Sequence, residues 1–443
     1  MYLLYRVLTA LSMLVLAPYY AYRGWRRGDA GGWRQRFGGV PPEVSRRADT
    51  REPNPIWIHA VSVGEVLAAI PLAGALRNQL PRSAIYVSTT TETGQQLARE
   101  RLKCADAVFY FPLDWVISVR RALKAVRPSI VVMMETEIWP NFLREAADFA
   151  VPVVFANARI SDNSYARYLR WKFLIAEFYE RVLLDADMFL AQTPKDAERL
   201  REMGAPEERV QVTGNLKYDV PAPTVGPFGT WLTQQIRQQE RWPVLVAGSV
   251  VAEEEESVLA AYDIVQRRWR RALLILAPRK PDRFEAAADI VEASGWHLVR
   301  RSKVDTSEAN PMLDENADVL LLDSIGELAG LYSLGDAVFV GGSLVPAGGH
   351  NILEPAWFLR PPIFGKSMEN FRDMADQFLA ARAGVQVATG PQLGKIWVQM
   401  IEDAPLRDRM GKAARAICER NRGATERCVD QILAVLNSKG RST

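Results

Sequence analysis

The sequence predicts an α/β protein of two doubly wound domains, each a parallel sheet covered by helices on both faces. Two features indicate this fold. From residue 55 onward, short apolar runs typical of buried strands alternate with segments patterned as helices. In the middle of the chain, residues 218–229 (YDVPAPTVGPFG) are rich in proline and glycine, which is typical of a domain boundary. Ligands of such sheets bind outside the carboxyl ends of the strands, so we expect functional residues to follow strands and to face a cleft between the domains.

The elements are expected in the following order. In the first half, strands are expected at residues 56–60, 84–88, 108–111, 129–134, 151–156 and 188–191. The helices of this half are expected at 65–79, 91–103, 115–126, 142–149, 164–184 and 194–203. In the second half, strands are expected at 243–247, 272–277, 297–300, 318–322, 337–340 and 362–364, with helices at 254–271, 283–294 and about 405–437. This order predicts a first domain over 55–217, a linker over 218–242, a second domain over 243–404 and C-terminal helices over 405–443.

The composition excludes several classes of protein. A chain of 443 residues is long enough for two or three domains. Its net charge of +3 is too small to indicate nucleic acid as the main partner. The three cysteines are scattered, which argues against a disulfide scaffold, and the three histidines lie too far apart in sequence to indicate a zinc site.

The N-terminal segment is the most apolar part of the sequence. Residues 2–22 carry one charge, Arg6, and aromatic and basic side chains gather at the end of the segment: Tyr19, Tyr20, Tyr22, Arg23, Trp25, Arg26 and Arg27. This pattern predicts a membrane anchor over residues 1–22, either a single span or an interfacial helix, with the body of the protein on the cytoplasmic side. An ordinary core helix is the alternative. The cluster Arg34, Arg36 and Phe37 keeps residues 23–54 basic and aromatic, which suits either an anionic membrane surface or a solvated loop.

A glycine-rich loop follows the expected strand 337–340. Residues 337–356 read AVFVGGSLVPAGGHNILEPA, and the two glycine pairs allow bare backbone N–H groups to approach an anion closely. Glu354 would lie in the first turn of the next helix, where it could accept hydrogen bonds from ribose hydroxyls. A tight strand-to-helix turn with a favourable early acid is the alternative interpretation.

Two carboxylates follow strands of the first domain. Glu65, in HAVSVGE, lies at the start of the first helix. It is either a partner of the helix dipole or a general base for a hydroxyl nucleophile. Glu135, in METEIWPN, follows the strand 129–134 and either caps a helix that begins near Pro140 or takes part in catalysis.

The cationic candidates lie beside the linker and in the second domain. Lys217, in GNLKYD, could reach a phosphate or a sugar carboxylate, although a lone lysine usually faces solvent. Arg279, in APRKP, follows the strand 272–277 and is placed for bidentate contact with a phosphate. A positively charged turn without a ligand is the alternative. Ser249 could donate to a phosphate. The acidic run 253–256 is interpreted as a first helix turn without chemistry.

These motifs occur in one chain in the order HAVSVGE, METEIWPN, GNLKYD, APRKP, IGEL and FVGGSLVPAGGHNILEPA. In this combination the chain resembles the 3-deoxy-D-manno-oct-2-ulosonic acid (Kdo) transferases of lipopolysaccharide synthesis over nearly its whole length. The resemblance implies the GT-B fold, two Rossmann-like domains that face each other across a cleft. It also implies an inverting transfer of Kdo from CMP-Kdo to a lipid A precursor (lipid IVA) with release of CMP.

The resemblance further implies residue roles. Glu65 would be the proton acceptor, and Glu135 and Lys217 would stabilise the transition state. The CMP portion would be bound by residues of three loops: Pro278, Arg279, Ile325, Gly326, Glu327, Asn351, Ile352, Leu353 and Glu354. No cofactor and no metal ion are expected, since CMP-Kdo is a co-substrate. The segment 248–256 (GSVVAEEEE) departs from the family pattern, which leaves a donor contact at Ser249 open.

A lipid acceptor would explain the anchor. The resemblance implies a protein of the bacterial inner membrane whose partners are CMP-Kdo, the lipid A precursor and the membrane surface, with its catalytic body on the cytoplasmic side. Two alternatives remain: a GT-B enzyme that uses a UDP-sugar, and a non-enzymatic, membrane-tethered binding protein with the same fold. A dehydrogenase is disfavoured because no GxGxxG follows the first strand.

Overall fold

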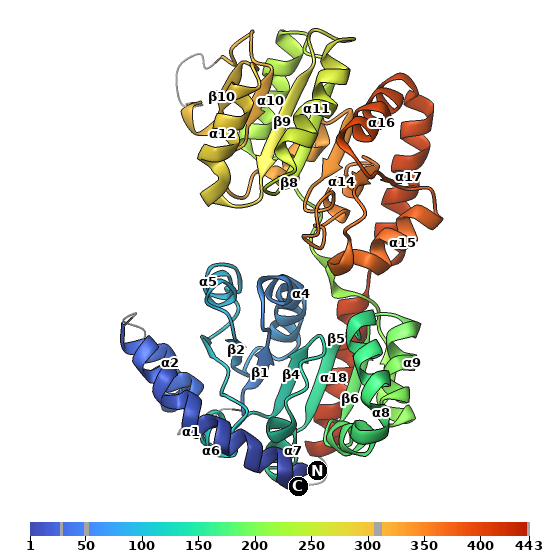
Figure 1. Ribbon diagram of the computed structural model, residues 1–443. Helices are drawn as coiled ribbons and strands as arrows, with labels where there is room; N and C mark the ends of the chain where they lie inside the picture. Colours follow the sequence, from blue (N-terminus) through green and yellow to red (C-terminus); the bar gives the residue numbers. More distant parts are fainter. Residues whose placement is uncertain (27–29, 48–52, 305–311, 441–443) are drawn as a thin grey trace. The chain divides into compact units, whose positions relative to one another are not determined.

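The chain forms two compact units in a computed structural model that describes residues 1–26, 30–47, 53–304 and 312–440. The first unit comprises Met1–Val220 together with Asn421–Thr443, and the second comprises Pro221–Arg420 (Figure 1). Each unit contains one seven-stranded sheet whose strands pair in parallel. The predicted fold of two doubly wound α/β domains is therefore confirmed.

The first sheet has the strand order β3-β2-β1-β4-β5-β6-β7. Its strands are β1 (Ile56–His59), β2 (Ile85–Thr89), β3 (Ala107–Tyr110), β4 (Ile130–Met134), β5 (Val153–Ala158), β6 (Met188–Ala191) and β7 (Val210–Val212). Helices α6 (Val116–Val126), α7 (Pro140–Asp148), α8 (Asp162–Leu183) and α9 (Pro194–Glu202) cover one face. Helices α4 (Val63–Gln79) and α18 (Ala424–Gly440) pack on the other face, and α5 (Glu92–Arg101) follows β2. The inner strands are buried on both faces, which explains their continuous apolar runs.

The second sheet has the strand order β10-β11-β9-β8-β12-β13-β14. Its strands are β8 (Val244–Val250), β9 (Leu273–Pro278), β10 (Leu298–Arg300), β11 (Val319–Leu321), β12 (Ala337–Val340), β13 (Pro362–Phe364) and β14 (Val385–Gln386). The helices of this unit are α10 (Pro227–Gln238), α11 (Glu255–Gln266), α12 (Phe284–Ala293), α13 (Leu328–Leu331), α14 (Leu353–Trp357), α15 (Arg372–Ala380), α16 (Gly390–Glu402) and α17 (Ala404–Arg420).

Two features of the domain organisation differ from the expected one. The division between the units falls at Val220, and the segment 218–242, expected as a linker, contains helix α10. The two C-terminal helices do not form one group, because α17 belongs to the second unit and α18 to the first. Helix α18 buries Cys428 and Ile432 in the core that α4 shares with the first sheet.

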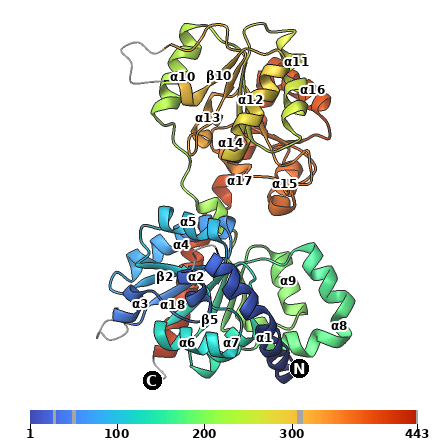
Figure 2. The same ribbon diagram turned by 60° about the vertical axis from the view of Figure 1, so that its left-hand side comes forward.

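The N-terminal segment folds as helix α1 (Tyr2–Arg26), which lies along the outside of the first unit beside α7 (Figures 1 and 2). Among the helices of the described residues, none is both long and apolar enough to span a bilayer. The anchor predicted over residues 1–22 is therefore not confirmed as a span. The interfacial helix, which was the other form of that prediction, stays a prediction.

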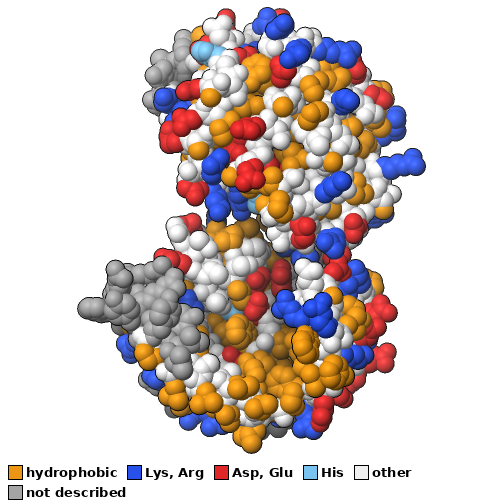
Figure 3. Space-filling model, in the orientation of Figure 1, with side chains coloured by type: hydrophobic (Ala, Val, Ile, Leu, Met, Phe, Trp, Pro, Cys, Tyr) orange, Lys and Arg blue, Asp and Glu red, His pale blue; other side chains and the backbone are white. Residues whose placement is uncertain are grey.

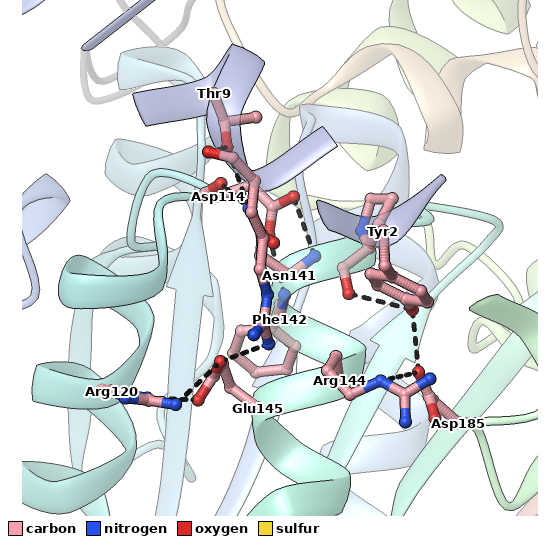
Figure 4. Close-up of polar contacts among 11 residues, drawn as sticks. Tyr2, Thr9, Asp114, Arg120, Asn141, Phe142, Arg144, Glu145 and Asp185 are labelled. Atoms are coloured by element: carbon pink, nitrogen blue, oxygen red, sulfur yellow. Dashed lines mark hydrogen bonds and ion pairs between the residues drawn. The ribbon is translucent and has the colours of Figure 1, made fainter. Parts of the chain in front are cut away.

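Polar side chains attach α1 to the first unit (Figure 4). The Tyr2 hydroxyl donates to Asp185 (2.8 Å), and Arg6 pairs with the fully buried carboxylate of Glu145 (2.7 Å). One turn further, Thr9 accepts a hydrogen bond from Asn141 (3.2 Å). The docked face of the N-terminal half of α1 thus includes polar groups, although the segment as a whole is apolar.

The segment after α1 packs on the edge strand β3 through helix α2 (Ala30–Arg36), and α3 (Pro42–Arg47) follows. The Arg36 guanidinium lies 4.3 Å from the Tyr110 ring centre and donates to the Thr90 carbonyl (2.7 Å). Arg36 therefore contacts the first unit, and α2 covers its edge strand, whereas the membrane-proximal role expected for residues 23–54 stays a prediction. Arg34 is exposed, whereas Arg27 lies outside the described residues.

A buried carboxylate fixes the glycine-rich loop of the second unit. Glu254, just before α11, accepts hydrogen bonds from the backbone N–H groups of Val251 (3.1 Å), Gly342 (2.6 Å), Ser343 (2.8 Å) and Leu344 (2.7 Å). A side chain at Gly341 would bring its Cβ to within 2.9 Å of this carboxylate. Two expectations are corrected here. The Gly342 N–H of the first glycine pair is not free to bind an anion, because it donates to Glu254. The acidic run 253–256 is more than a first helix turn, because Glu254 binds the backbone of the glycine-rich loop.

We expect Glu254→Gln to lower the free energy of unfolding of the second unit by about 2–4 kcal/mol, because the new amide NH₂ group would leave two buried N–H groups without an acceptor. Denaturant unfolding measures the change. Glu256→Gln is the matched control, since Glu256 lies in the same helix turn and is exposed. Equal unfolding midpoints for the two variants would contradict this account of the loop.

Candidate active site

The predicted site residues of the first unit lie where the strand order of its sheet reverses. Strands β1 and β4 are neighbours there, while the chain passes to β2 and β3 on one side and to β5 on the other. All strands are parallel, so their carboxyl ends share one edge, and the loops after β1 and β4 diverge at that point. Glu65 follows β1 and Glu135 follows β4, as the sequence predicted.

Glu65 is bound back to the loop that precedes it. Its carboxylate accepts hydrogen bonds from the Val61 N–H (2.7 Å) and the Ser62 hydroxyl (3.0 Å), and the residue is only 7% exposed. Burial, and then the negative charge of Glu135, raise the pKa of Glu65 to about 8. The group therefore exchanges its proton close to neutral pH, as a general acid or base must do.

Glu135 interacts with both Glu65 and Lys217. Its backbone has a left-handed φ of 55°, and its Oε1 atom is 3.8 Å from the Lys217 Nζ. Burial, and then the charge of Glu135, also raise the pKa of Glu137, so three carboxylates interact at this sheet edge. Glu137 lies in the same loop as Glu135, two residues further along the chain.

Lys217 is fixed to the first unit. It lies in a short 3-10 helix, η2 (Leu216–Asp219), in which the Leu216 N–H donates to the Asn157 side chain (3.0 Å). The Asp219 carboxylate accepts from the N–H groups of Gly423 (2.7 Å) and Thr425 (2.5 Å) at the start of α18. The Lys217 ammonium group is thus held beside Glu135, rather than facing solvent as a lone lysine usually does.

In the second unit, the loops after β9 and β12 bring Arg279, His350 and Glu354 together. Burial raises the pKa of Glu354 to about 7, although a hydrogen bond from Asn351 (3.3 Å) and the charge of Arg279 oppose this rise. Burial, and then the charge of Arg279, lower the pKa of His350 to about 4, so its imidazole is neutral at neutral pH. Arg279 and Asn351, both predicted site residues, therefore act on the carboxylate of a third, Glu354.

The loop after β11 is less clearly part of this group. Its Glu327 carboxylate is paired with Arg301 (3.1 Å), and Ile325 is 76% exposed beside Gly326, whose φ is +92°. Pro278 ends β9, and Ile352 and Leu353 are buried at the start of α14, so these three contribute backbone and packing. Ser249 has a left-handed φ of 55°, and its donor contact stays a prediction.

Sequence reasoning missed His350 as a site residue. Its Nε2 atom is buried and has no hydrogen-bond partner within the described part of the chain. The sequence considered this histidine only as a metal ligand. Its place between the second glycine pair and Asn351 was the signal that could have identified it.

The family model and two bacterial relatives indicate one family. A family model described as 3-deoxy-D-manno-octulosonic-acid transferase (kdotransferase) matches residues 31–220. The 3-deoxy-D-manno-octulosonic acid transferase of Haemophilus influenzae is 35% identical over 381 residues, which cover 85% of this chain and 86% of the relative. The transferase of the same name from Bordetella pertussis is 33% identical over 447 residues, covering 95% and 97% of the two chains.

A solved structure supports the fold alone. The UDP-GlcNAc 2-epimerase from Neisseria meningitidis, bound to UDP-GlcNAc, has a TM-score of 0.55 at 14% identity, over 86% of this chain and 100% of that chain. The identity to the two bacterial transferases, over most of both chains, carries the assignment. The chain belongs to the family of 3-deoxy-D-manno-octulosonic acid transferases.

Proposed function

We propose that the protein transfers Kdo from CMP-Kdo to a hydroxyl group of a lipid A precursor, with inversion at the anomeric carbon. The observation that carries this proposal is the placement of Glu65 beside Glu135 and Lys217 at the carboxyl edge of the first sheet. A buried carboxyl group with a raised pKa, next to a second carboxylate and a cation, is suited to proton transfer. Membership of the Kdo transferase family supports the donor sugar.

In the proposed step, the acceptor oxygen attacks the anomeric carbon of Kdo while the bond from that carbon to the phosphate oxygen breaks. Glu65 takes the proton of the acceptor hydroxyl, and CMP leaves with the bonding electron pair. Positive charge develops at the anomeric carbon, and the Glu135 carboxylate would stabilise it. Lys217 would pair with the carboxylate of Kdo or with the leaving phosphate. A single displacement inverts the anomeric carbon.

The second unit would hold the CMP portion. The Arg279 guanidinium would bind the phosphate, and the neutral His350 ring would donate or accept one further hydrogen bond. Glu354 would accept hydrogen bonds from ribose hydroxyls. Burial destabilises the charged form of Glu354 and raises its pKa to about 7, and hydrogen bonds from the hydroxyls would stabilise the carboxylate. The proposal assigns no cofactor and no metal ion.

We further propose that α1 is an interfacial helix at the bacterial inner membrane, with the catalytic body on the cytoplasmic side. Its outward face consists of large apolar side chains that are 47–76% exposed: Leu3, Leu4, Val7, Leu8, Leu11 and Leu14. A helix of a soluble surface normally turns such residues toward the core, whereas α1 turns Tyr2, Arg6 and Thr9 inward. Hydrophobic side chains also gather on the first unit over α1 and α7 (Figure 3).

The first test is product mass spectrometry after incubation with CMP-Kdo and lipid IVA. We expect the mass of the acceptor to increase by one or more Kdo residues, with release of CMP. CMP, but not UDP, should compete with the donor, since the alternative GT-B enzyme would use a UDP-sugar. Transfer from a UDP-sugar, or no transfer at all, would contradict the proposed function.

Replacing Glu65 with Gln should lower kcat about 10²–10⁴-fold, because the base is lost. For the intact protein, the basic form of Glu65 increases with pH. We therefore expect kcat/KM to rise about tenfold per pH unit below pH 8 and to level off above it. A rate assay between pH 6 and about pH 9 measures both effects. Glu92→Gln is the control, since Glu92 is an exposed acid in the first turn of α5. A flat profile, or a Glu65→Gln variant as active as Glu92→Gln, would exclude Glu65 as the base.

Replacing Leu4, Leu8 and Leu11 together with Gln should release the protein from anionic vesicles without changing its unfolding midpoint, because all three side chains are more than half exposed. Vesicle flotation measures the bound fraction. Leu359→Gln changes an exposed apolar side chain of the second unit and should not affect flotation. Equal flotation of the triple variant and the unmodified protein would contradict the interfacial role of α1.

A further inference from the structure

A cavity of about 220 Å³ lies between α1, α7 and α8 in the first unit. Its wall combines aromatic and aliphatic side chains with polar groups: Tyr5, Ile138, Pro140, Phe178, Tyr179 and Val182. Two of these polar groups already have partners, since the Tyr5 hydroxyl donates to the Asp114 carboxylate (2.8 Å) and the Pro140 carbonyl accepts from the Tyr2 hydroxyl (3.3 Å). The cavity is therefore suited to a hydrocarbon group rather than to a polar ligand.

The cavity shares a loop with the candidate catalytic carboxylates. Ile138 belongs to the short segment between β4 and α7, which begins with Glu135 and includes Glu137, and Pro140 is the first residue of α7. The reciprocal hydrogen bonds between Thr136 and the backbone of Arg159 (2.6 and 2.8 Å) fix this segment to the loop after β5. A ligand in the cavity would thus be held at a defined place relative to Glu135.

The cavity continues an exposed apolar surface. On α8, Trp171, Leu174 and Phe178 are spaced i, i+3 and i+7, so they lie on one helix face, and the first two are 49% and 53% exposed. This face leads from the surface to the Phe178 wall of the cavity. The exposed basic side chains Arg170 and Lys172 flank Trp171, which suits an anionic lipid headgroup region.

We propose that the cavity binds one acyl chain of the acceptor lipid and so positions the acceptor sugar at Glu65 and Glu135. The inference rests on the proposed function and deepens it, because it makes acylation of the acceptor a determinant of recognition. For acceptors dissolved in water as monomers, binding moves the chain out of water and into the cavity. Each methylene group buried in the cavity should strengthen acceptor binding about fourfold.

The test compares two acceptors, lipid IVA and the same disaccharide freed of its fatty acids, with CMP-Kdo as donor. The measured quantity is the ratio of the KM of the deacylated acceptor to the KM of lipid IVA. We expect this ratio to be large for the unmodified protein and to fall at least about tenfold in Val182→Trp, which fills the cavity. Leu184→Trp is the matched control, because Leu184 lies two residues further on the chain and is exposed.

Two further measurements keep the outcome decisive if Val182→Trp does not fold. Phe178→Ala removes a wall of the cavity and should also lower the ratio. With the unmodified protein, synthetic acceptors with chains of increasing length should show a KM that falls with each methylene until the cavity is filled. An unchanged ratio in the folded variants, or a KM independent of chain length, would overturn the acyl-chain site while leaving Kdo transfer intact. No product from any acceptor would instead overturn the proposed function.

Discussion

The parallel alignment of the strands is the constraint on which the rest of the molecule depends. Because every strand of a sheet points the same way, residues far apart in sequence arrive at one edge. In the first unit this alignment brings Glu65 and Glu135 together from the loops after β1 and β4. In the second unit it brings Arg279 and Glu354 together from the loops after β9 and β12. In the first unit, β1 and β4 are neighbours at the point where the strand order reverses, whereas in the second unit β9 and β12 lie on either side of β8.

Buried carboxylates serve two different purposes in this chain. Glu254 receives four backbone N–H groups and therefore acts as an internal anion that shapes the glycine-rich loop. Glu65 receives only one N–H group and one hydroxyl, while Glu135 repels its charge. A carboxylate that is fully hydrogen-bonded is stable in place, whereas one that is under-bonded is ready to exchange a proton. The number of hydrogen-bond donors, rather than burial alone, distinguishes the structural carboxylate Glu254 from Glu65, the proposed base.

Much of the fold and of the candidate site could be predicted from the sequence, because strands buried on both faces leave uninterrupted apolar runs and the charged residues after them are easy to locate. What could not be predicted depends on contacts between distant segments. Glu254 finds its partners on a loop about ninety residues away, and Glu327 is engaged by Arg301. Hydropathy identified the apolar segment at the N-terminus. It could not indicate which face of α1 would dock, because Asp185, Glu145 and Asn141 determine that.

The return of the last helix to the first unit has a consequence for biosynthesis. Helix α18 supplies part of the core on the α4 side of the first sheet, where Cys428 and Ile432 are completely buried. Until the ribosome has made this helix, the nascent chain exposes that apolar face to water. The second unit is continuous in sequence from Pro221 to Arg420, so it can finish folding before the first. The first unit therefore completes its core only after the whole second unit has been synthesised, so its N-terminal half exposes apolar surface for longer than a domain that is continuous in sequence would.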